Sequence, residues 1–206
     1  MREDSIATSF RKRRIFRMLN MLDLTKKVNI LDIGGTFSYW VGLGTLYRHE
    51  NVEITIINLE VQNKDLNNLH MRQGDACALR EYDNNSFDLV HSNSVIEHVG
   101  NERHMAAMAG EIRRLAPKHF VQTPDYACLI EPHYKLPFIH WLPEETKIKV
   151  LRAFKKVPRD REQSLASVRG TNLLGVREFK SLFPESTIWR ERVFGLPKSL
   201  VAIRDW

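Results

Sequence analysis

The sequence has only two cysteines, Cys77 and Cys128, and they stand in no Cys-x-x-Cys or other metal-type spacing. This scarcity excludes a disulfide-stapled scaffold and a zinc site built from cysteines. We therefore expect both residues to be free thiols that pack as small apolar side chains.

Long apolar runs are also missing. No stretch approaches the ~20 residues that span a bilayer, and the chain begins Met1-Arg2-Glu3-Asp4, with charges where a secretory signal needs apolar residues. We therefore expect a cytoplasmic protein without a transmembrane segment. At ~150 residues per domain, a chain of 206 residues is expected to form one domain, 1–206.

Charge is plentiful but unevenly distributed. Residues 1–27 hold eight Lys/Arg against three Asp/Glu (+5), whereas residues 28–134 hold eight against fourteen (−6). Residues 135–162 hold eight against four (+4) and the remainder seven against four (+3). The overall charge of +6 favours a nucleic-acid partner. The acidic residues 28–134 instead favour a core that binds a cationic ligand, with basic segments on either side that contact an anionic partner.

Short apolar, β-branched runs alternate with helical periodicity through most of the chain. Strands are expected at residues 28–33, 52–59, 87–92, 119–122, 187–193 and 199–203, and helices at 10–24, from the Gly34-Gly35-Thr36 turn to about 50, around 105–112 and at 176–183. This order indicates an α/β fold with a mostly parallel sheet. The last two strands, joined by a short loop, should pair antiparallel.

Two segments depart from this alternation. Residues 1–27 form an N-terminal helical segment that carries the basic run from Arg11 to Arg14. Residues 125–163 are rich in aromatics, prolines and histidines and lead into a basic helix. We expect Val150, Ala153, Phe154 and Val157 to share one face of that helix, and the segment to lie like a lid over the sheet.

Polar residues follow the predicted strands where ligands bind in parallel sheets. Asp32-Ile33-Gly34-Gly35-Thr36 lacks the third glycine of the dinucleotide motif and the Gly-Lys-Ser/Thr of a phosphate loop. Asn58 and Glu60 follow the second strand, Gly74-Asp75-Ala76 precedes the third, and Ser92-Asn93-Ser94-Val95-Ile96-Glu97-His98 follows it.

Taken together, these blocks resemble the class I S-adenosylmethionine-dependent methyltransferases. The resemblance covers residues 28–124 closely: the stretch 30–40 is similar to the first motif of the family, and Gly74-Asp75-Ala76 and residues 86–99 to the third and fourth blocks. It implies a Rossmann-like sheet of seven mostly parallel strands, with helices on both faces and an antiparallel terminal pair.

The resemblance also implies a cofactor, S-adenosylmethionine. Asp32 would hold water or the amino end of the cofactor, Gly34 and Gly35 would run beside its methionine part, and Thr36 stands where the family has a further glycine. The ribose position is Asn58 rather than an acid, with Leu59 and Glu60 following. Asp75 with Ala76 would bind the adenine, and Ser92 with Asn93 would line the sulfonium side. The acidic middle suits a sulfonium cation better than the phosphates of NAD or ATP.

The acceptor is predicted to be a small molecule, with anionic metabolites among the candidates, methylated at O or N. Aromatics of the lid would line its pocket, and a basic face would guide it. Candidates for removal of its proton are His133 and, second, His98. The lining aromatics are Tyr126, Tyr134, Phe138 and Trp141, and the basic face is Lys147, Lys149, Arg152, Lys155 and Lys156.

Some quinone-pathway O-methyltransferases of this class bind a divalent ion through Glu-x-x-Glu-His at the end of the fourth strand. Here the first carboxylate is replaced by Ser94, which leaves Glu97 and His98, so we expect no metal. Two alternatives stay open: an RNA methyltransferase, favoured by the basic flanks, and a non-catalytic subunit with the methyltransferase fold, favoured by Asn58 and the unusual turn. The sequence does not indicate an oligomeric state.

Overall fold

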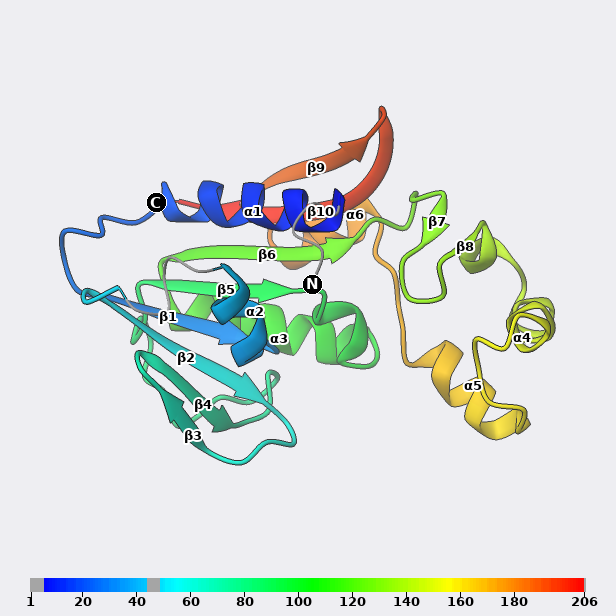
Figure 1. Ribbon diagram of the computed structural model, residues 1–206, viewed down its shortest axis with the longest axis horizontal. Coiled ribbons are helices and arrows are strands. Elements are labelled where there is room, and N and C mark those ends of the chain that lie inside the picture. Colours follow the sequence, from blue (N-terminus) through cyan, green and yellow to red (C-terminus); the bar gives the residue numbers. More distant parts are fainter. Residues whose placement is uncertain (1–5, 44–48, 206) are drawn as a thin grey trace. The chain divides into compact units, whose positions relative to one another are not determined.

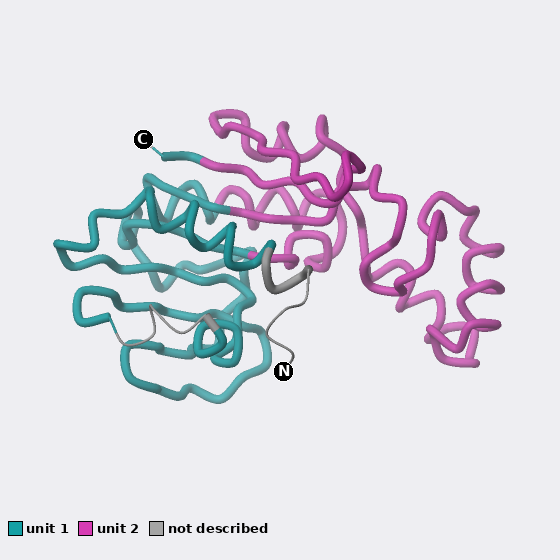
Figure 2. The backbone as a smooth tube through the Cα atoms, turned by 45° about the horizontal axis from the view of Figure 1, so that its top comes forward, with its two compact units in different colours: residues 1–92, 111–120, 204–206 teal, residues 93–110, 121–203 magenta. Residues whose placement is uncertain are grey.

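The computed structural model describes residues 6–43 and 49–205, and the chain divides into two compact units (Figure 2). The first comprises residues 1–92, 111–120 and 204–206, and the second residues 93–110 and 121–203. The expected single domain over residues 1–206 stays a prediction.

The main sheet has eight strands in the hydrogen-bonded order β3-β4-β2-β1-β5-β6-β10-β9. Their bounds are β1 Val28–Ile33, β2 Val52–Asn58, β3 Lys64–Leu66, β4 Leu69–Gln73, β5 Leu89–Asn93, β6 Lys118–Pro124, β9 Thr187–Val193 and β10 Leu196–Arg204. β9 and β10 pair antiparallel, as expected. The predicted α/β architecture is thus confirmed, but with eight strands rather than seven.

The first unit contains the parallel part of the sheet. β1 pairs parallel with β2 and β5, and β2 pairs parallel with β4, so these strands run in one direction (Figure 1). β3 and β4 were not predicted: every side chain of β3 is exposed, and Leu69 is the one fully buried residue of β4. Strands this polar carry little of the apolar pattern by which strands are recognised.

Some element bounds differ from prediction for local reasons. The helix expected at residues 10–24 is α1, Ile6–Leu19, which ends earlier: beyond it the N–H groups of Met21 and Leu22 donate to carbonyl oxygens only three residues back, at Met18 and Leu19. The helix expected to reach residue 50 is α2, Phe37–Leu43; residues 44–48 lie outside the described part. β6 continues through Thr123 to Pro124, its last residue.

The remaining helices are α3 Glu102–Leu115, α4 Glu144–Ala153, α5 Arg161–Arg169 and α6 Val176–Leu182, with short 3-10 turns η1 Ile96–His98 and η2 Ile139–Trp141. Among the described residues no helix is both long and apolar enough to cross a membrane. Cys128 is a buried free thiol, as expected, whereas Cys77 is free but only half-buried.

In the second unit, the segment predicted as a lid has its own small core. It contains the hairpin β7 Ile130–Glu131 and β8 Leu136–Pro137, then η2, and α4 and α5 lying side by side (Figure 1). Its buried residues are Ile139, Ile148, Leu151, Val157 and Val168. The predicted helix face was therefore wrong: α4 ends at Ala153, and Phe154 beyond it is 60% exposed.

Candidate functional site

The carboxyl ends of neighbouring strands in the first unit lie at one level. Ile33, the last residue of β1, is paired with Ile57 of β2 and with Ser92 of β5. Gly74, which follows β4, donates its N–H to the carbonyl oxygen of Asn58 at the end of β2 (3.0 Å). The loops that carry the predicted cofactor residues therefore meet at one edge of the sheet, where ligands of parallel sheets bind.

The turn after β1 requires both of its glycines. Gly34 has φ +77°, in the left-handed region that glycine adopts without strain. A Cβ on Gly35 would stand 1.6 Å from Oδ2 of Asp32, so no larger residue fits there without displacing that carboxylate. The amide of Asn58 donates to the carbonyl oxygen of Gly35 (2.6 Å) and ties this turn to the end of β2.

Asp32 is buried, and both of its carboxylate oxygens are engaged by side chains. Oδ2 accepts the indole N–H of Trp40 (2.6 Å), and Oδ1 accepts from Nδ1 of His91 (2.7 Å). The ring of His91 stacks on that of Tyr39 (5.6 Å between centroids). Burial, followed by the charge of Asp32, raises the pKa of Tyr39.

Sequence analysis missed Trp40 and His91. The available signal was His91 itself, a polar residue within the apolar strand β5, which pairs in register with Asp32. Asp32 is hydrogen-bonded to both of these residues. We therefore infer that it holds the glycine turn after β1 in place.

The two residues after β2 are both exposed: Leu59 is 64% exposed, and Glu60 is exposed as well. The Gln73 side chain donates to the carbonyl oxygen of Leu59 (2.9 Å) and fixes this loop. Thr36, which replaces a family glycine, accepts the N–H of Tyr39 at its hydroxyl (3.2 Å) and begins α2.

The remaining predicted cofactor residues follow β4 and β5. Asp75 is exposed and its Oδ1 accepts the N–H of Cys77 (2.9 Å), while Ala76 beside it is half-buried. Ser92 is buried and donates its hydroxyl to the carbonyl oxygen of Ile33 (3.1 Å). Asn93, the last residue of β5, falls in the second unit.

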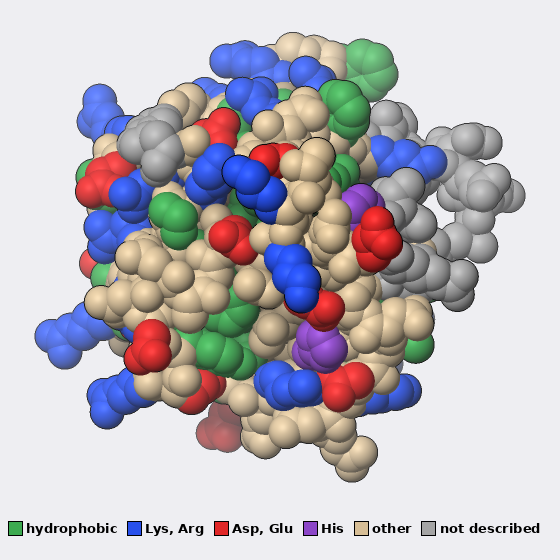
Figure 3. All heavy atoms as spheres, turned by 90° about the vertical axis from the view of Figure 1, so that its left-hand side faces the viewer, with side chains coloured by type: hydrophobic (Ala, Val, Ile, Leu, Met, Phe, Trp, Pro, Cys, Tyr) green, Lys and Arg blue, Asp and Glu red, His purple; other side chains and the backbone are tan. Residues whose placement is uncertain are grey.

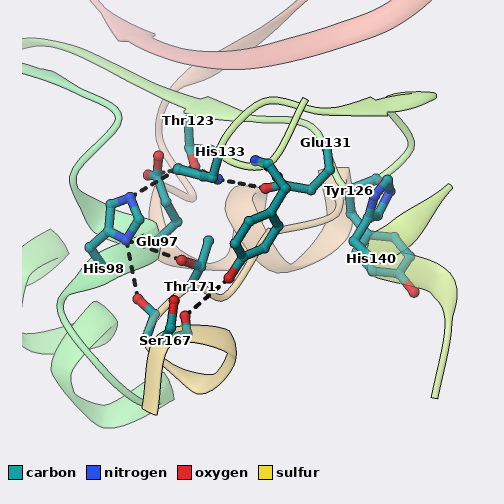
Figure 4. Close-up of polar contacts among 11 residues, drawn as sticks. Glu97, His98, Thr123, Tyr126, Glu131, His133, His140, Ser167 and Thr171 are labelled. Carbon is teal, nitrogen blue, oxygen red and sulfur yellow. Dashed lines mark hydrogen bonds and ion pairs between the residues drawn. The ribbon is translucent and has the colours of Figure 1, made fainter. Parts of the chain in front are cut away.

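The second unit brings the two predicted histidines together. Nε2 of His98 lies 3.0 Å from Nε2 of His133 (Figure 4). Glu97, beside them, is fully buried, and its Oε2 accepts the hydroxyl of Thr123 (2.9 Å). Glu131 accepts from Nδ1 of His133 (2.5 Å). Glu131 and Thr123 were not predicted.

Electrostatics in this cluster favour a charged His133. The hydrogen bond to Glu131 raises the pKa of His133 against the opposing effect of burial. Burial acts to raise the pKa of Glu131, but the hydrogen bonds from His133 and the Tyr134 N–H outweigh it, and the net direction is down. Burial raises the pKa of Glu97.

A pocket of about 1180 Å³ opens in the second unit, between the start of α3, α6 and the segment after β6. Tyr126, His140, Lys147 and Arg103 are among its lining residues. His140 donates from Nε2 to the carbonyl oxygen of Tyr126 (2.9 Å; Figure 4), and burial lowers the pKa of both His140 and Lys147.

Of the four aromatics predicted to line an acceptor pocket, Tyr126 lines this one. Tyr134 instead packs against the small core of α4 and α5. Phe138 and Trp141 are 48% and 43% exposed, and their rings lie together with centroids 5.5 Å apart.

Gly35→Ala is expected to destabilise the fold by about 1–3 kcal/mol, because the added methyl group would overlap the buried Asp32 carboxylate. Gly110→Ala is the matched control, since a Cβ there meets nothing within 4 Å and Gly110 lies inside a helix. Urea denaturation measures both. Equal stability of the two variants would contradict the close approach at Gly35.

Residues 33–119 match the family described as "Methyltransferase domain". The solved structures similar to this chain include the CurJ carbon methyltransferase (TM-score 0.58, 12% identity, 98% of this chain and 56% of that chain). They also include a SAM-dependent methyltransferase from Methanosarcina mazei (0.53, 15%, 91% and 95%) and the N-terminal domain of EvdMO1 with SAH bound (0.55, 13%, 97% and 84%). No curated protein matches the chain.

At these identities the likeness to solved structures establishes the fold. The chain spans about half the length (56%) of the CurJ structure but most of the one from Methanosarcina mazei (95%). The expected Rossmann-like fold is thus confirmed, and the family match falls on the part of the chain that holds the first motif and the strand ends. Residues 33–119 thus match a methyltransferase-domain family, and the chain as a whole has the Rossmann-like fold of methyltransferases.

Proposed function

We propose that this protein transfers a methyl group from S-adenosylmethionine to an oxygen or nitrogen atom of a small acceptor, with anionic metabolites among the candidates. The observation that carries the proposal is one edge of the sheet in the first unit. The carboxyl ends of β1, β2, β4 and β5 meet at this edge, and β1 is followed there by a glycine turn in which Gly34 has a left-handed conformation. Such an edge leaves backbone open to a ligand.

The residues at this edge fit the cofactor. The bare backbone at Gly34 and Gly35 would accept its methionine part, because neither glycine has a side chain of its own. Asp75, exposed after β4, would accept the adenine amino group, with Ala76 against the ring. For the ribose we favour Glu60, since the Asn58 amide already donates to the carbonyl oxygen of Gly35.

Asp32, Thr36 and Ser92 support this site rather than contact the cofactor in our proposal. Asp32 is engaged by Trp40 and His91, and the hydroxyls of Thr36 and Ser92 bond to neighbouring backbone. Leu59 and Asn93 stay predicted contacts. When bound, S-adenosylmethionine supplies the electrophilic methyl carbon, so the protein has to align the acceptor and exclude water.

The pocket of the second unit is our candidate for the acceptor. Its volume exceeds what a small metabolite needs, and its wall carries both signs of charge: Arg103 and Lys147, to which an anionic group could bind, and Glu102 and Glu178. Burial lowers the pKa of Lys147, because the ammonium group loses solvation there. A bound anion would compensate for the lost solvation. His133 and His98 as proton acceptors stay a prediction.

The basic flank is a weak argument for an RNA substrate. In the run from Arg11 to Arg14, Arg14 is buried and the Arg11 guanidinium lies 5.6 Å from the centre of the Tyr39 ring. On the face in Figure 3, basic side chains are interspersed with acidic ones. A nucleic-acid surface is expected to gather one sign of charge.

Asp75→Ala is expected to weaken S-adenosylhomocysteine binding about tenfold, since one charge-assisted hydrogen bond to the adenine would be lost. Asp88→Ala is the control, because Asp88 is also an exposed aspartate but precedes β5, at the opposite end of that strand. Calorimetry measures both affinities. Unchanged binding in Asp75→Ala would contradict the site.

Transfer itself is tested with a labelled methyl donor and anionic, neutral and RNA acceptors. We expect labelling of a small acceptor that falls with added salt. Binding without transfer to any acceptor would favour the non-catalytic subunit, and a folded protein that binds no S-adenosylhomocysteine would refute the proposal.

A further inference from the structure

Glu97, His98 and His133 form a cluster of potential metal ligands, and its two histidines are the ones predicted above as proton acceptors. Glu97 and His98 belong to η1, and His133 lies between β7 and β8. One ligand atom from each of the three lies within 4.8 Å of the other two. Ligand bonds of ~2.0–2.2 Å to a shared ion require separations of ~3–3.5 Å, which small side-chain rotations would give.

The outer nitrogen of each imidazole is held by an acceptor. Nδ1 of His98 lies 3.1 Å from the carbonyl oxygen of Gly170, and Nδ1 of His133 lies 2.5 Å from the Glu131 carboxylate. Because neither oxygen group donates, each Nδ1 carries a proton. In the neutral rings both Nε2 atoms then have lone pairs, and these face each other at 3.0 Å (Figure 4).

Two nitrogens this close share one cation: either a proton on Nε2 of the charged His133, donated to His98, or a metal ion that takes the place of that proton. A carbonyl or carboxylate behind the distal nitrogen is the usual arrangement around histidines that bind metals, since it fixes the tautomer and ring orientation. The two histidines therefore have the partners that metal ligands have, in addition to suitable positions.

The carboxylate supplies an independent observation. Glu97 is fully buried, and its Oε2 accepts the Thr123 hydroxyl, but Oε1 is buried without a hydrogen-bond partner among the described residues. A buried carboxylate oxygen with no partner is costly. A cation beside Oε1 would remove that cost.

We propose that Glu97 Oε1, His98 Nε2 and His133 Nε2 bind one divalent first-row transition-metal ion, as a site of two histidines and one carboxylate. Nitrogen and oxygen ligands in this ratio suit Zn²⁺, Fe²⁺ or Mn²⁺. Both histidines are partly exposed, so solvent or another oxygen ligand can complete the coordination.

The prediction from sequence that no metal binds rested on two ligands in one motif. The third ligand, His133, is 35 residues away from His98 and is brought to it by the fold. Ligation through both Nε2 atoms leaves neither ring free to accept a proton there, so the metal site replaces the predicted base role.

The test uses untagged protein stripped with a chelator and titrated with Zn²⁺ by calorimetry, with Co²⁺ absorption as a check on coordination. We expect one ion per chain, at least tenfold weaker binding in His98→Gln and His133→Gln, and 10–100-fold weaker binding in the positioning variant Glu131→Gln. His140→Gln, in the same segment but bonded to Tyr126, is the control and should bind normally.

Wild-type binding no tighter than that of His98→Gln/His133→Gln would overturn the site, as would a ratio far from one per chain. His133 is partly exposed, so His133→Gln should fold even if a variant of buried Glu97 does not. S-adenosylhomocysteine affinity, measured on the same samples, separates the two proposals. Protein that binds S-adenosylhomocysteine but no metal ion would refute only the metal site. Protein that binds the metal ion but no S-adenosylhomocysteine would refute only the cofactor site.

Discussion

Asp32→Ala is expected to lower the free energy of unfolding by about 3–5 kcal/mol, because it leaves the indole N–H of Trp40 and Nδ1 of His91 buried without their acceptor. Both groups lie inside the first unit, where solvent cannot replace the carboxylate. Urea denaturation at neutral pH measures the loss.

Two variants sharpen this result. Asp32→Asn keeps one acceptor oxygen, so we expect a smaller loss of about 1–2 kcal/mol. Asp75→Ala removes an exposed carboxylate that accepts one backbone N–H, so stability should fall by less than about 1 kcal/mol while cofactor binding weakens. Loss of less than 1 kcal/mol in Asp32→Ala would show that Asp32 does not hold the turn.

His119 is expected to make the fold sensitive to acid. It is fully buried in β6, and burial, followed by the charges of Arg204 and Arg113, lowers its pKa from 6.5 to about 3. The unfolded chain therefore binds a proton that the folded chain does not. Stability from this residue is complete above about pH 6.5 and falls toward pH 3, by ~1.4 kcal/mol per unit.

His119→Leu should remove this slope between pH 6 and pH 4, as measured by urea denaturation over a pH series. His70→Asn is the contrasting variant: its hydrogen bond to Glu53 raises the pKa of His70, which gives a dependence of opposite sign. His70→Asn should therefore not flatten the curve. Parallel curves for wild type and His119→Leu would contradict the assignment.

The parts that sequence predicted well depend on local pattern. β1 was predicted with its observed bounds, because Val28–Ile33 is a short, mostly apolar and β-branched run that ends at two glycines. The glycine turn also followed from local chemistry, since only glycine tolerates the backbone at Gly34. The polar strands β3, at the edge of the sheet, and β4, next to it, carry too weak a pattern to be recognised.

The amino-acid sequence by itself determined the α/β order, the antiparallel end and the motifs that match a methyltransferase-domain family at residues 33–119, because each depends on residues close together in the chain. Tertiary structure alone decided which polar groups meet: that Asp32 faces Trp40 and His91, and that His133 reaches His98 beside Glu97. Such pairings join residues far apart in the chain, and no local periodicity encodes the distance between two side chains on different elements.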